Sequence, residues 1–452
     1  MSKILKQITK KIEQDRNVFL TGGAGVGKTT TARETIDSYD NVIVLAFTGM
    51  AAANIGGQTI HSFFQFPLHQ QQTLSPLYPK QKRTIRAARL IVIDEVSMVP
   101  RHVMDWIKIR MREAGSNANF LLVGDFYQLS PIPELGKEPE YAFESVYWDE
   151  LKLINVELTI IKRTQDSDFM QVLNQLRVGN VTPEVRRYLR SMQETKVDEK
   201  TVTQLYSTNN KVEEINRNRL DELPVEVSSF NLKQELFIEK DDHYFQKFIE
   251  NLPIVKTLLL KPGAQVILTF NCKDRGIYNG KKAVIDRIED GAITTKDGDV
   301  IRQKEYECLK FDSKYDANGS NDIVIEQRVG IVYQYPIKLA YALTIHKSQG
   351  MSIDGLLVDL SKTFAAGQAY VAISRSVNPA NTMLHLPTER PLEDLFFHDE
   401  KIERFYSAIS YDIVEEVPHS TPIDMELMRQ IQEFAELKGE NINMLLQQLL
   451  PA

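Results

Sequence analysis

The sequence predicts an α/β protein made of two units, each a parallel sheet covered by helices, with a small antiparallel β module inserted. Near-continuous apolar runs alternate with helix-like segments from about residue 17 to 125, and a second such series begins near residue 201. Short alternating segments with turn signals fill residues 271–333. Parallel strands are buried on both faces and are therefore continuously apolar, whereas strands with one wet face alternate.

The strands expected in the first unit are "NVFLT" (17–21), "NVIVLAF" (41–47), "RLIVID" (89–94) and "NFLLVGD" (119–125), with a short insert at about 65–86. The second unit is expected to use the strands "TVTQLYST" (201–208), "AQVILTF" (264–270), "DGLLVDLS" (354–361) and "NTMLHL" (381–386), and a helix at 209–220. Near the C-terminus, "STPIDMELMRQIQEFAELKG" predicts a capped amphipathic helix. Packing on the core is favoured for it over docking to a partner.

Bulk composition limits the function classes. A formal charge of −7 argues against a broad basic surface for gripping duplex DNA but leaves room for a narrow basic channel. Cys272 and Cys308 are too few for a disulfide framework, which favours a reducing compartment. The charged N-terminal segment lacks a signal-peptide core, and no run reaches membrane-spanning length. We expect a cytoplasmic protein without a membrane partner.

The stretch "FLTGGAGVGKTTTA" (19–32) predicts a phosphate-binding loop, because it matches G-x-x-x-x-G-K-[ST] between a strand and a helix. Glycines let backbone N–H groups turn toward phosphate, Lys28 reaches the outer phosphates, and the Thr29 hydroxyl is suited to Mg²⁺. The candidate nucleotide-binding residues here are Gly22, Gly23, Ala24, Gly25, Val26, Gly27, Lys28, Thr29 and Thr30.

Acidic and polar residues follow two later strands of the same unit. In "LIVIDEVSM" (90–98), Asp94 is a candidate Mg²⁺ ligand and Glu95 a candidate base for the attacking water. In "VGDFYQLSP" (123–131), Gln128 is placed to sense the γ-phosphate. The pattern predicts nucleoside triphosphate hydrolysis.

Two stretches of the second unit have the residues expected of a surface that faces this nucleotide. "LTIHKSQGMSIDG" (343–355) concentrates polar and basic residues before a glycine, and "AAGQAYVAISR" (365–375) ends a small-residue helix with Arg375. Arg375 is therefore a candidate arginine finger. In isolation, an ordinary polar turn and an arginine at a helix end explain these stretches equally well.

Taken together, the motifs resemble the Pif-one family of DNA helicases, relatives of RecD in superfamily 1B. The resemblance rests on the loop above, "AFTGMAAANIGGQTIHSFF" (46–64), "IVIDEVSM", "GDFYQLSP", "VELTIIKRTQD" (156–166), "TIHKSQGMSID" and "GQAYVAISR", which occur in family order. It implies two RecA-like P-loop domains in tandem, 1–164 and 165–270 plus 334–390. It also implies a wedge at 65–86, an SH3-like β-barrel at 271–333, and a C-terminal helical extension at 391–452 that no motif covers.

The resemblance also implies roles for individual residues. Lys28, Glu95, Gln128, Arg163 and Arg375 would be catalytic, with Gly350 at the nucleotide. On the DNA side, Phe63 is a base-stacking or core residue, with the core favoured, and the other candidates are Thr48, Gly49, His61, Ser62, Thr344, His346, Lys347 and Ser348.

Two departures from the family pattern stand out: Thr164 follows Arg163 where the family commonly has glutamine, and Gln7 is the nearest candidate for reading adenine. A basic cluster formed by Lys80, Lys82, Arg83, Arg86 and Arg89 is read as a solvated face in preference to a phosphate contact.

The function that the resemblance implies is an ATP- and Mg²⁺-dependent helicase. It would move 5′ to 3′ on single-stranded DNA as a monomer and open forks, with G-quadruplex DNA as a further candidate substrate and protein partners docking through the C-terminal extension. Two alternatives remain open at this point: a nucleotide-gated DNA-binding switch, and a RecD-like subunit of a larger complex.

Overall fold

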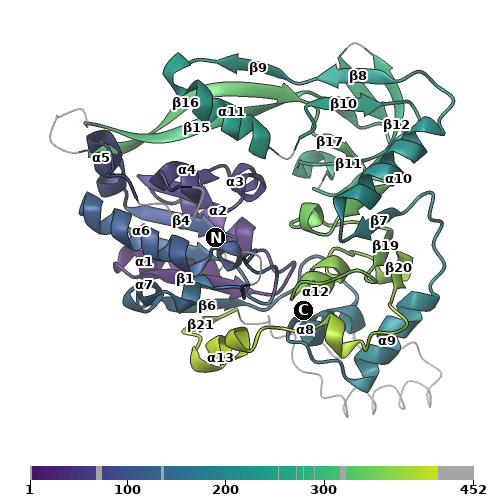
Figure 1. Cartoon of the computed structure of the whole chain (residues 1–452), viewed down its shortest axis with the longest axis horizontal. Helices are drawn as coiled ribbons and strands as arrows, with labels where there is room; N and C mark the ends of the chain where they lie inside the picture. Colours follow the sequence, from purple (N-terminus) through teal and green to yellow (C-terminus); the bar gives the residue numbers. More distant parts are fainter. Residues whose placement is uncertain are drawn as a thin grey trace, which may run out of the picture. The chain divides into compact units, whose positions relative to one another are not determined.

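The computed structural model describes residues 3–67, 74–133, 137–252, 254–270, 272–277, 279–289, 291–315 and 322–415. The amphipathic helix expected at 420–439 and residues 68–73 of the short insert lie outside this range. Two all-parallel sheets confirm the predicted α/β class (Figure 1). None of the helices in the described ranges is long and apolar enough to cross a membrane.

The first parallel sheet has the strand order β21-β6-β1-β5-β4-β2-β3 within the described residues. Its central strands are buried along their whole length, as their continuous apolar runs predict. The strands are β1 (Val18–Gly22), β2 (Val42–Ala46), β3 (Gln58–Thr59), β4 (Leu90–Asp94), β5 (Asn119–Val123), β6 (Ile154–Leu158) and β21 (Ile413–Val414). Their helices are α1 (Lys3–Glu13), α2 (Lys28–Ile36), α3 (Gly49–Ile55), α4 (Ile60–Phe64), α5 (Pro79–Ala87), α6 (Arg101–Ala114) and α7 (Val146–Glu150).

The second parallel sheet has the order β18-β7-β19-β20. Its strands are β7 (Thr203–Tyr206), β18 (Ala342–Thr344), β19 (Leu356–Asp359) and β20 (Thr382–His385). Its helices are α8 (Ser167–Arg177), α9 (Pro183–Glu194), α10 (Asn209–Asp221) and α12 (Gln368–Ile373). Three of the four strands expected from the sequence occur here, and β18 takes the place of the fourth.

The fourth expected strand was assigned to the wrong sheet. β11 (Gln265–Leu268) pairs antiparallel with β12 (Lys282–Glu289) and with β17 (Ile337–Leu339). The assignment was wrong because a short apolar run looks the same in a buried parallel strand and in the core strand of an antiparallel module. The module therefore includes residues on both sides of 271–333.

Antiparallel pairing characterises this β module throughout. One sheet has the order β14-β13-β12-β11-β17, a second β15-β16-β9, and a third β10-β8. An SH3-like barrel for the first of these remains a prediction. The other elements of the module are β8 (Ser228–Asn231), β9 (Lys233–Leu236), β10 (Thr257–Leu260), β13 (Ala292–Thr295), β14 (Val300–Arg302), β15 (Lys304–Tyr315), β16 (Asp322–Gln334) and α11 (Asp242–Asn251).

A long hairpin of β15 and β16 extends from the β module to α5 of the first unit (Figure 1). Phe311 of the hairpin meets the ring of Phe63 with centroids 6.1 Å apart, and Asp312 forms an ion pair with Lys80. The hairpin therefore packs on the segment that the resemblance marks as the wedge.

Intramolecular contacts occupy four cations of the basic cluster near α5, while Lys80, Arg86 and Arg89 remain exposed, as expected of a solvated face. Lys80 pairs with Asp312, and Lys82 pairs with Glu113 at 3.2 Å. The guanidinium of Arg86 donates to the Ala114 carbonyl at 2.8 Å, and that of Arg89 lies over the Tyr39 ring. The Nε atom of Arg83 is buried.

The segment after residue 390 contributes to the first sheet. β21 pairs in parallel with β6, and α13 (Glu400–Ala408) packs the ring of Phe405 on Phe126 and Phe143 at centroid distances of 5.3 and 4.3 Å. Residues 391–414 are thus part of the compact unit that ends at Val414, not a separate helical extension as the sequence led us to expect. A two-residue edge strand leaves almost no pattern in a sequence.

Candidate functional site

The loop between β1 and α2 folds around its own lysine. Gly22, Gly25 and Gly27 have φ of 139°, 80° and 96°, a region that favours glycine. The ammonium of Lys28 donates to the carbonyls of Gly22 and Gly23 at 2.7 and 3.0 Å. The loop thereby brings its N–H groups and a cation to one wall of a cavity of about 450 Å³.

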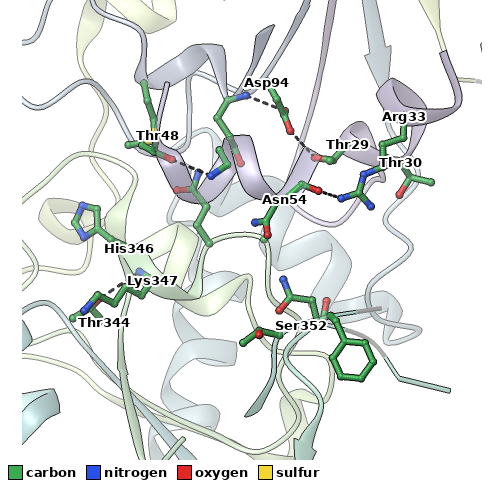
Figure 2. A pocket seen from close by; sticks show the side chains of 18 of the residues that line it. Thr29, Thr30, Arg33, Thr48, Asn54, Asp94, Thr344, His346, Lys347 and Ser352 are labelled. Atoms are coloured by element: carbon green, nitrogen blue, oxygen red, sulfur yellow. Dashed lines mark hydrogen bonds between the residues drawn. The ribbon is translucent and has the colours of Figure 1, made fainter. Parts of the chain in front are cut away.

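Two acidic residues lie at the end of β4, beside this loop: Asp94 is its last residue and Glu95 follows it. The Thr29 hydroxyl donates to Asp94 Oδ2 at 3.3 Å, so a hydroxyl and a carboxylate meet at the wall of a second, larger cavity (Figure 2). Glu95 adopts a left-handed backbone with φ of 52°. That turn brings its side chain to the wall of the smaller cavity.

Burial shapes the electrostatics of these groups. Burial, followed by the charge of Asp94, raises the pKa of Glu95 to about 7. Burial also raises the pKa of Asp94 and lowers that of Lys28, the latter against the charges of Asp125 and Glu95. A carboxyl that titrates near neutrality is suited to accept a proton from water.

Gln128 reaches the same cavity from the turn after β5 and is 6% exposed. Its amide donates to Asp125 Oδ2 at 3.2 Å. Asp125 is fully buried, and Arg177 of α8 donates to its two oxygens at 3.0 and 3.1 Å. The side chain of Gln128 is therefore held by a buried ion pair.

Two arginines of other segments line the cavity: Arg163, which is half-buried and lies beside Gly25 of the loop, and Arg375, which is buried. Arg163 donates to the Ser352 hydroxyl at 2.9 Å and to the Ser374 carbonyl at 2.7 Å. Arg375, 2% exposed, donates to the Val371 carbonyl and the Ser374 hydroxyl. Burial lowers the pKa of Arg163 to about 10, and burial with the neighbouring Arg163 lowers that of Arg375 well below its usual range.

Both guanidinium groups bond only neutral oxygens in these contacts, and no ion pair joins either to a carboxylate within the described residues. Burying two neighbouring cations is costly unless a negative charge accompanies them. An anionic ligand in the cavity would supply that charge.

Tyr370 of α12 links the second unit directly to the loop. Its hydroxyl accepts the backbone N–H of Ala24 at 2.8 Å. A Cβ atom at Gly23 would lie 3.3 Å from the same hydroxyl, so a small residue lets the two units approach here. Nothing in the sequence singled out Tyr370, because a tyrosine in an apolar helix resembles a core residue.

A larger cavity of about 830 Å³ lies between the two parallel sheets (Figure 2). Thr29, Asp94 and Thr48 line it from the first unit, and Thr344, His346 and Lys347 face them from the second. Lys304 and Phe270 of the β module complete the wall. Polar and basic groups from three parts of the chain thus share one cleft.

A third cavity of about 490 Å³ adjoins Thr48 and is lined by aromatic rings of Phe47, Phe66 and Phe248. His61 lies among these rings, 5.6 Å from Phe47 and 6.0 Å from Phe66 between ring centroids. Burial, followed by the charges of His102 and Lys247, lowers the pKa of His61. A neutral imidazole between aromatic rings is suited to stacking against a flat ligand.

Comparison with known proteins identifies the family of this chain. Residues 1–187 match the family model described as PIF1-like helicase. The "ATP-dependent DNA helicase Pif1" of Campylobacter jejuni is 34% identical over 453 residues, covering 93% of this chain and 99% of the relative.

The chain belongs to the PIF1-like helicase family.

Other relatives of this family differ in length and in bound ligand. The PIF1 protein of Xenopus laevis is 32% identical over 80% of this chain, which spans only 58% of that relative. The structure of Bacteroides sp Pif1 in complex with ADP-AlF4 covers 90% of this chain and 96% of its own, at 27% identity and a TM-score of 0.77. Bacteroides Pif1 bound to ssDNA is similar at a TM-score of 0.61.

The residues that the family resemblance assigns to the nucleotide converge. Ala24, Gly25, Gly27, Thr29 and Thr30 line the smaller cavity together with Lys28, Glu95, Gln128, Arg163, Gly350 and Arg375. The side chain of Val26 is 1% exposed and packs in the core, so this residue offers only its backbone. Gln7 is exposed and is not among the lining residues, whereas Ile4 of the same helix is.

The residues assigned to DNA divide into two groups. Thr48, Gly49, His61, Ser62, Thr344, His346 and Lys347 line the larger or the aromatic cavity. Phe63 is 2% exposed and packs against Phe64 and Phe311, so the base-stacking role does not fit and the core role does. Ser348 is fully buried and donates to the Ile345 carbonyl, so a DNA contact through its side chain does not fit either.

Proposed function

We propose that this chain is an ATP-dependent DNA helicase that moves 5′ to 3′ along single-stranded DNA. The observation that supports it most is the pair Arg163 and Arg375, which line the cavity of the Lys28 loop and form no ion pair with a carboxylate in the part of the chain that the structure describes. A γ-phosphate there would supply the missing negative charge. The direction of movement rests on the family resemblance alone.

The placement of these residues supports a scheme for ATP hydrolysis. Lys28 leaves the loop carbonyls for the phosphates, and Arg163 and Arg375 neutralise charge that develops on the transferred phosphoryl group. Glu95 takes the proton of the attacking water, and Gln128 orients that water or senses the γ-phosphate.

The donor set at Thr29 and Asp94 fits Mg²⁺, which prefers hydroxyl and carboxylate oxygens and keeps other positions for phosphate. Bound there, Mg²⁺ would screen the charge of the phosphates. Every other step is carried by side chains of this chain.

Coupling to DNA would arise because both units contact the same ligands. When ATP is bound, its γ-phosphate attracts both the loop and the two arginines, which favours approach of the units. Loss of the phosphate removes that attraction. The cleft between Thr48 and Lys347 would then change its grip on a DNA strand in each cycle. The affinity for DNA must differ between the two states, because a ligand that binds both states equally well does not shift the equilibrium between them.

The proposal includes domain limits, substrates and location. The first RecA-like domain would run to residue 164 and include β21, and the second would hold β7, β18, β19 and β20. Within the β module, which is inserted between β7 and β18, the sheet β14-β13-β12-β11-β17 would be the SH3-like insert. Forked DNA is the proposed substrate and G-quadruplex DNA a second one. The low cysteine content supports a cytoplasmic location.

Steady-state ATPase with and without single-stranded DNA, measured beside unwinding of forks with a 5′ or a 3′ tail, tests the proposal. Lys28→Ala should abolish ATP turnover. Arg375→Ala should lower kcat about 10³-fold, while Arg217→Ala, which removes an exposed arginine of α10, should not.

Unwinding restricted to the 3′-tailed fork would contradict the direction. Turnover stimulated by DNA without any unwinding would indicate a nucleotide-gated switch, and an inert isolated chain would indicate a subunit of a larger complex.

A further inference from the structure

The C-terminal helix α13 reaches the nucleotide side of the first sheet, although no family motif covers it. Asp399 caps the helix by accepting the N–H of Lys401 at 2.9 Å. Phe405 fixes its position by packing on Trp148 and Phe19 at ring-centroid distances of 5.8 and 6.2 Å. Docking this helix in an aromatic cluster leaves Tyr406 pointing at the turn after β5.

The hydroxyl of Tyr406 lies among three polar groups of that sheet. It donates to Asp125 Oδ1 at 3.3 Å and accepts the backbone N–H of Phe126 at 3.1 Å. The Thr21 hydroxyl, on β1 next to the phosphate-binding loop, lies 3.2 Å away. The Tyr406 ring stacks on that of Tyr127 with centroids 4.6 Å apart and an interplanar angle of 9°.

The protonation states fix the direction of these hydrogen bonds. Burial, followed by the charge of Asp125, raises the pKa of Tyr406 well above its usual range, so its hydroxyl keeps its proton. Burial alone would raise the pKa of Asp125, but the charges of Arg177 and Lys28 hold it below its usual value. A neutral donor therefore faces an ionised acceptor, which strengthens a hydrogen bond.

The same carboxylate holds the side chain that faces the nucleotide. Asp125 accepts the amide of Gln128 on Oδ2, and its charge also raises the pKa of Lys28 against burial. The backbone N–H of Gln128 is bonded to the Asp125 carbonyl at 2.9 Å. Asp125 and Gln128 thus form one turn that Arg177 and Tyr406 hold from two other segments.

We propose that Tyr406 is a positioning residue for ATP hydrolysis, holding the Asp125 turn so that the Gln128 amide faces the nucleotide cavity. The inference rests on the proposed ATPase function. It gives residues 391–414 a role in turnover, not in recruiting a partner. Because Tyr406 does not line the cavity, its influence on the phosphate passes through Asp125 and Gln128.

Tyr406→Phe in the full chain removes only the hydroxyl. DNA-stimulated kcat should fall about tenfold, the effect of losing one hydrogen bond to a charged acceptor, while the KM for ATP changes less than about twofold because ground-state binding is untouched. Tyr188→Phe is the matched control, since it removes a hydroxyl from another stacked tyrosine; Tyr188 lies in α9, and its ring centroid is 6.1 Å from that of Phe169 in α8. Tyr188→Phe should unfold near the wild-type temperature, and Tyr406→Phe at a somewhat lower one, because Asp125 and the Phe126 N–H lose a partner.

A double-mutant cycle separates positioning from a general structural role. In a Gln128→Ala background, Tyr406→Phe should cause no further loss of kcat, because both changes remove the same effect. An equal loss in both backgrounds, or an unchanged kcat for Tyr406→Phe alone, would overturn the inference while leaving the ATPase function intact.

Amide hydrogen exchange gives a readout that does not depend on activity. Tyr406→Phe should speed exchange at Phe126 and Gln128 in the free protein, whereas Tyr188→Phe should not. If wild-type protein proved inactive, the proposed function would fail by itself. Unchanged exchange at these amides would then refute the positioning contact.

Discussion

Replacing Glu95 with glutamine should stabilise the free protein and abolish its ATPase. The carboxyl has an ordinary pKa of 4.5 and a pKa of about 7 in the folded chain, because burial and then the charge of Asp94 disfavour its ionised form. The unfolded chain therefore loses this proton at lower pH than the folded chain. The folded state gives up stability between pH 4.5 and about 7, and above that range the loss is complete.

The shift of the Glu95 pKa from 4.5 to about 7 lowers the free energy of unfolding at pH 8 by about 3 kcal/mol. Glu95→Gln removes the titrating group, so at pH 8 the variant should be more stable than wild type by up to this amount, and at pH 5 the two should differ little. Urea unfolding at both values measures the difference. Glu213→Gln, an exposed change of the same kind in α10, should have no effect.

The ATPase activity should also depend on the titration of Glu95. If Glu95 is the base, kcat/KM for ATP should rise tenfold per pH unit below about 7 and level above it, because this ratio reports the free enzyme. A wild-type profile that is flat between pH 5.5 and 8 would refute the assignment. So would a Glu95→Gln variant that retains turnover or gains no stability at pH 8.

Three further substitutions separate structural from ligand-facing residues. In Gly22→Ala, a Cβ would lie 2.2 Å from the Leu158 carbonyl oxygen at φ of 139°, so we expect a loss of about 3 kcal/mol or more in urea unfolding; a wild-type midpoint would contradict the tight contact. Phe63→Ala should cost about 3–5 kcal/mol of unfolding free energy because it opens the core, with single-stranded DNA affinity of the folded fraction unchanged by fluorescence anisotropy. His61→Ala should leave the thermal unfolding midpoint unchanged and lower the affinity for single-stranded DNA about tenfold. An unaltered affinity would show that His61 does not contact DNA.

The sequence could not predict contacts between segments that lie far apart along the chain. The strand at 264–270 was assigned to the wrong sheet because its apolar residues fit either one, and only pairing with β12 and β17 decides. The sequence predicts a solvated face for the basic cluster, and Lys80 is exposed, but its pairing with Asp312, more than two hundred residues away, leaves no local pattern.

Local spacing alone determined the nucleotide half of the site. A glycine-rich turn, Lys28 and Thr29 follow one strand, and Asp94 and Glu95 end another, so residue order within each strand and turn fixes where these side chains lie. The family resemblance named Ser348 for DNA but could not tell that its side chain is buried, whereas the core role favoured for Phe63 agrees with its burial.

Tertiary structure decided the rest of the site. Arg163 and Arg375 meet beside Ser374, Tyr370 bonds the loop at Ala24, and Tyr406 reaches Asp125 across 281 residues of sequence. The physical reason is that a local motif specifies backbone conformation over a few residues, whereas these contacts form only when separately folded sheets and a C-terminal helix pack together.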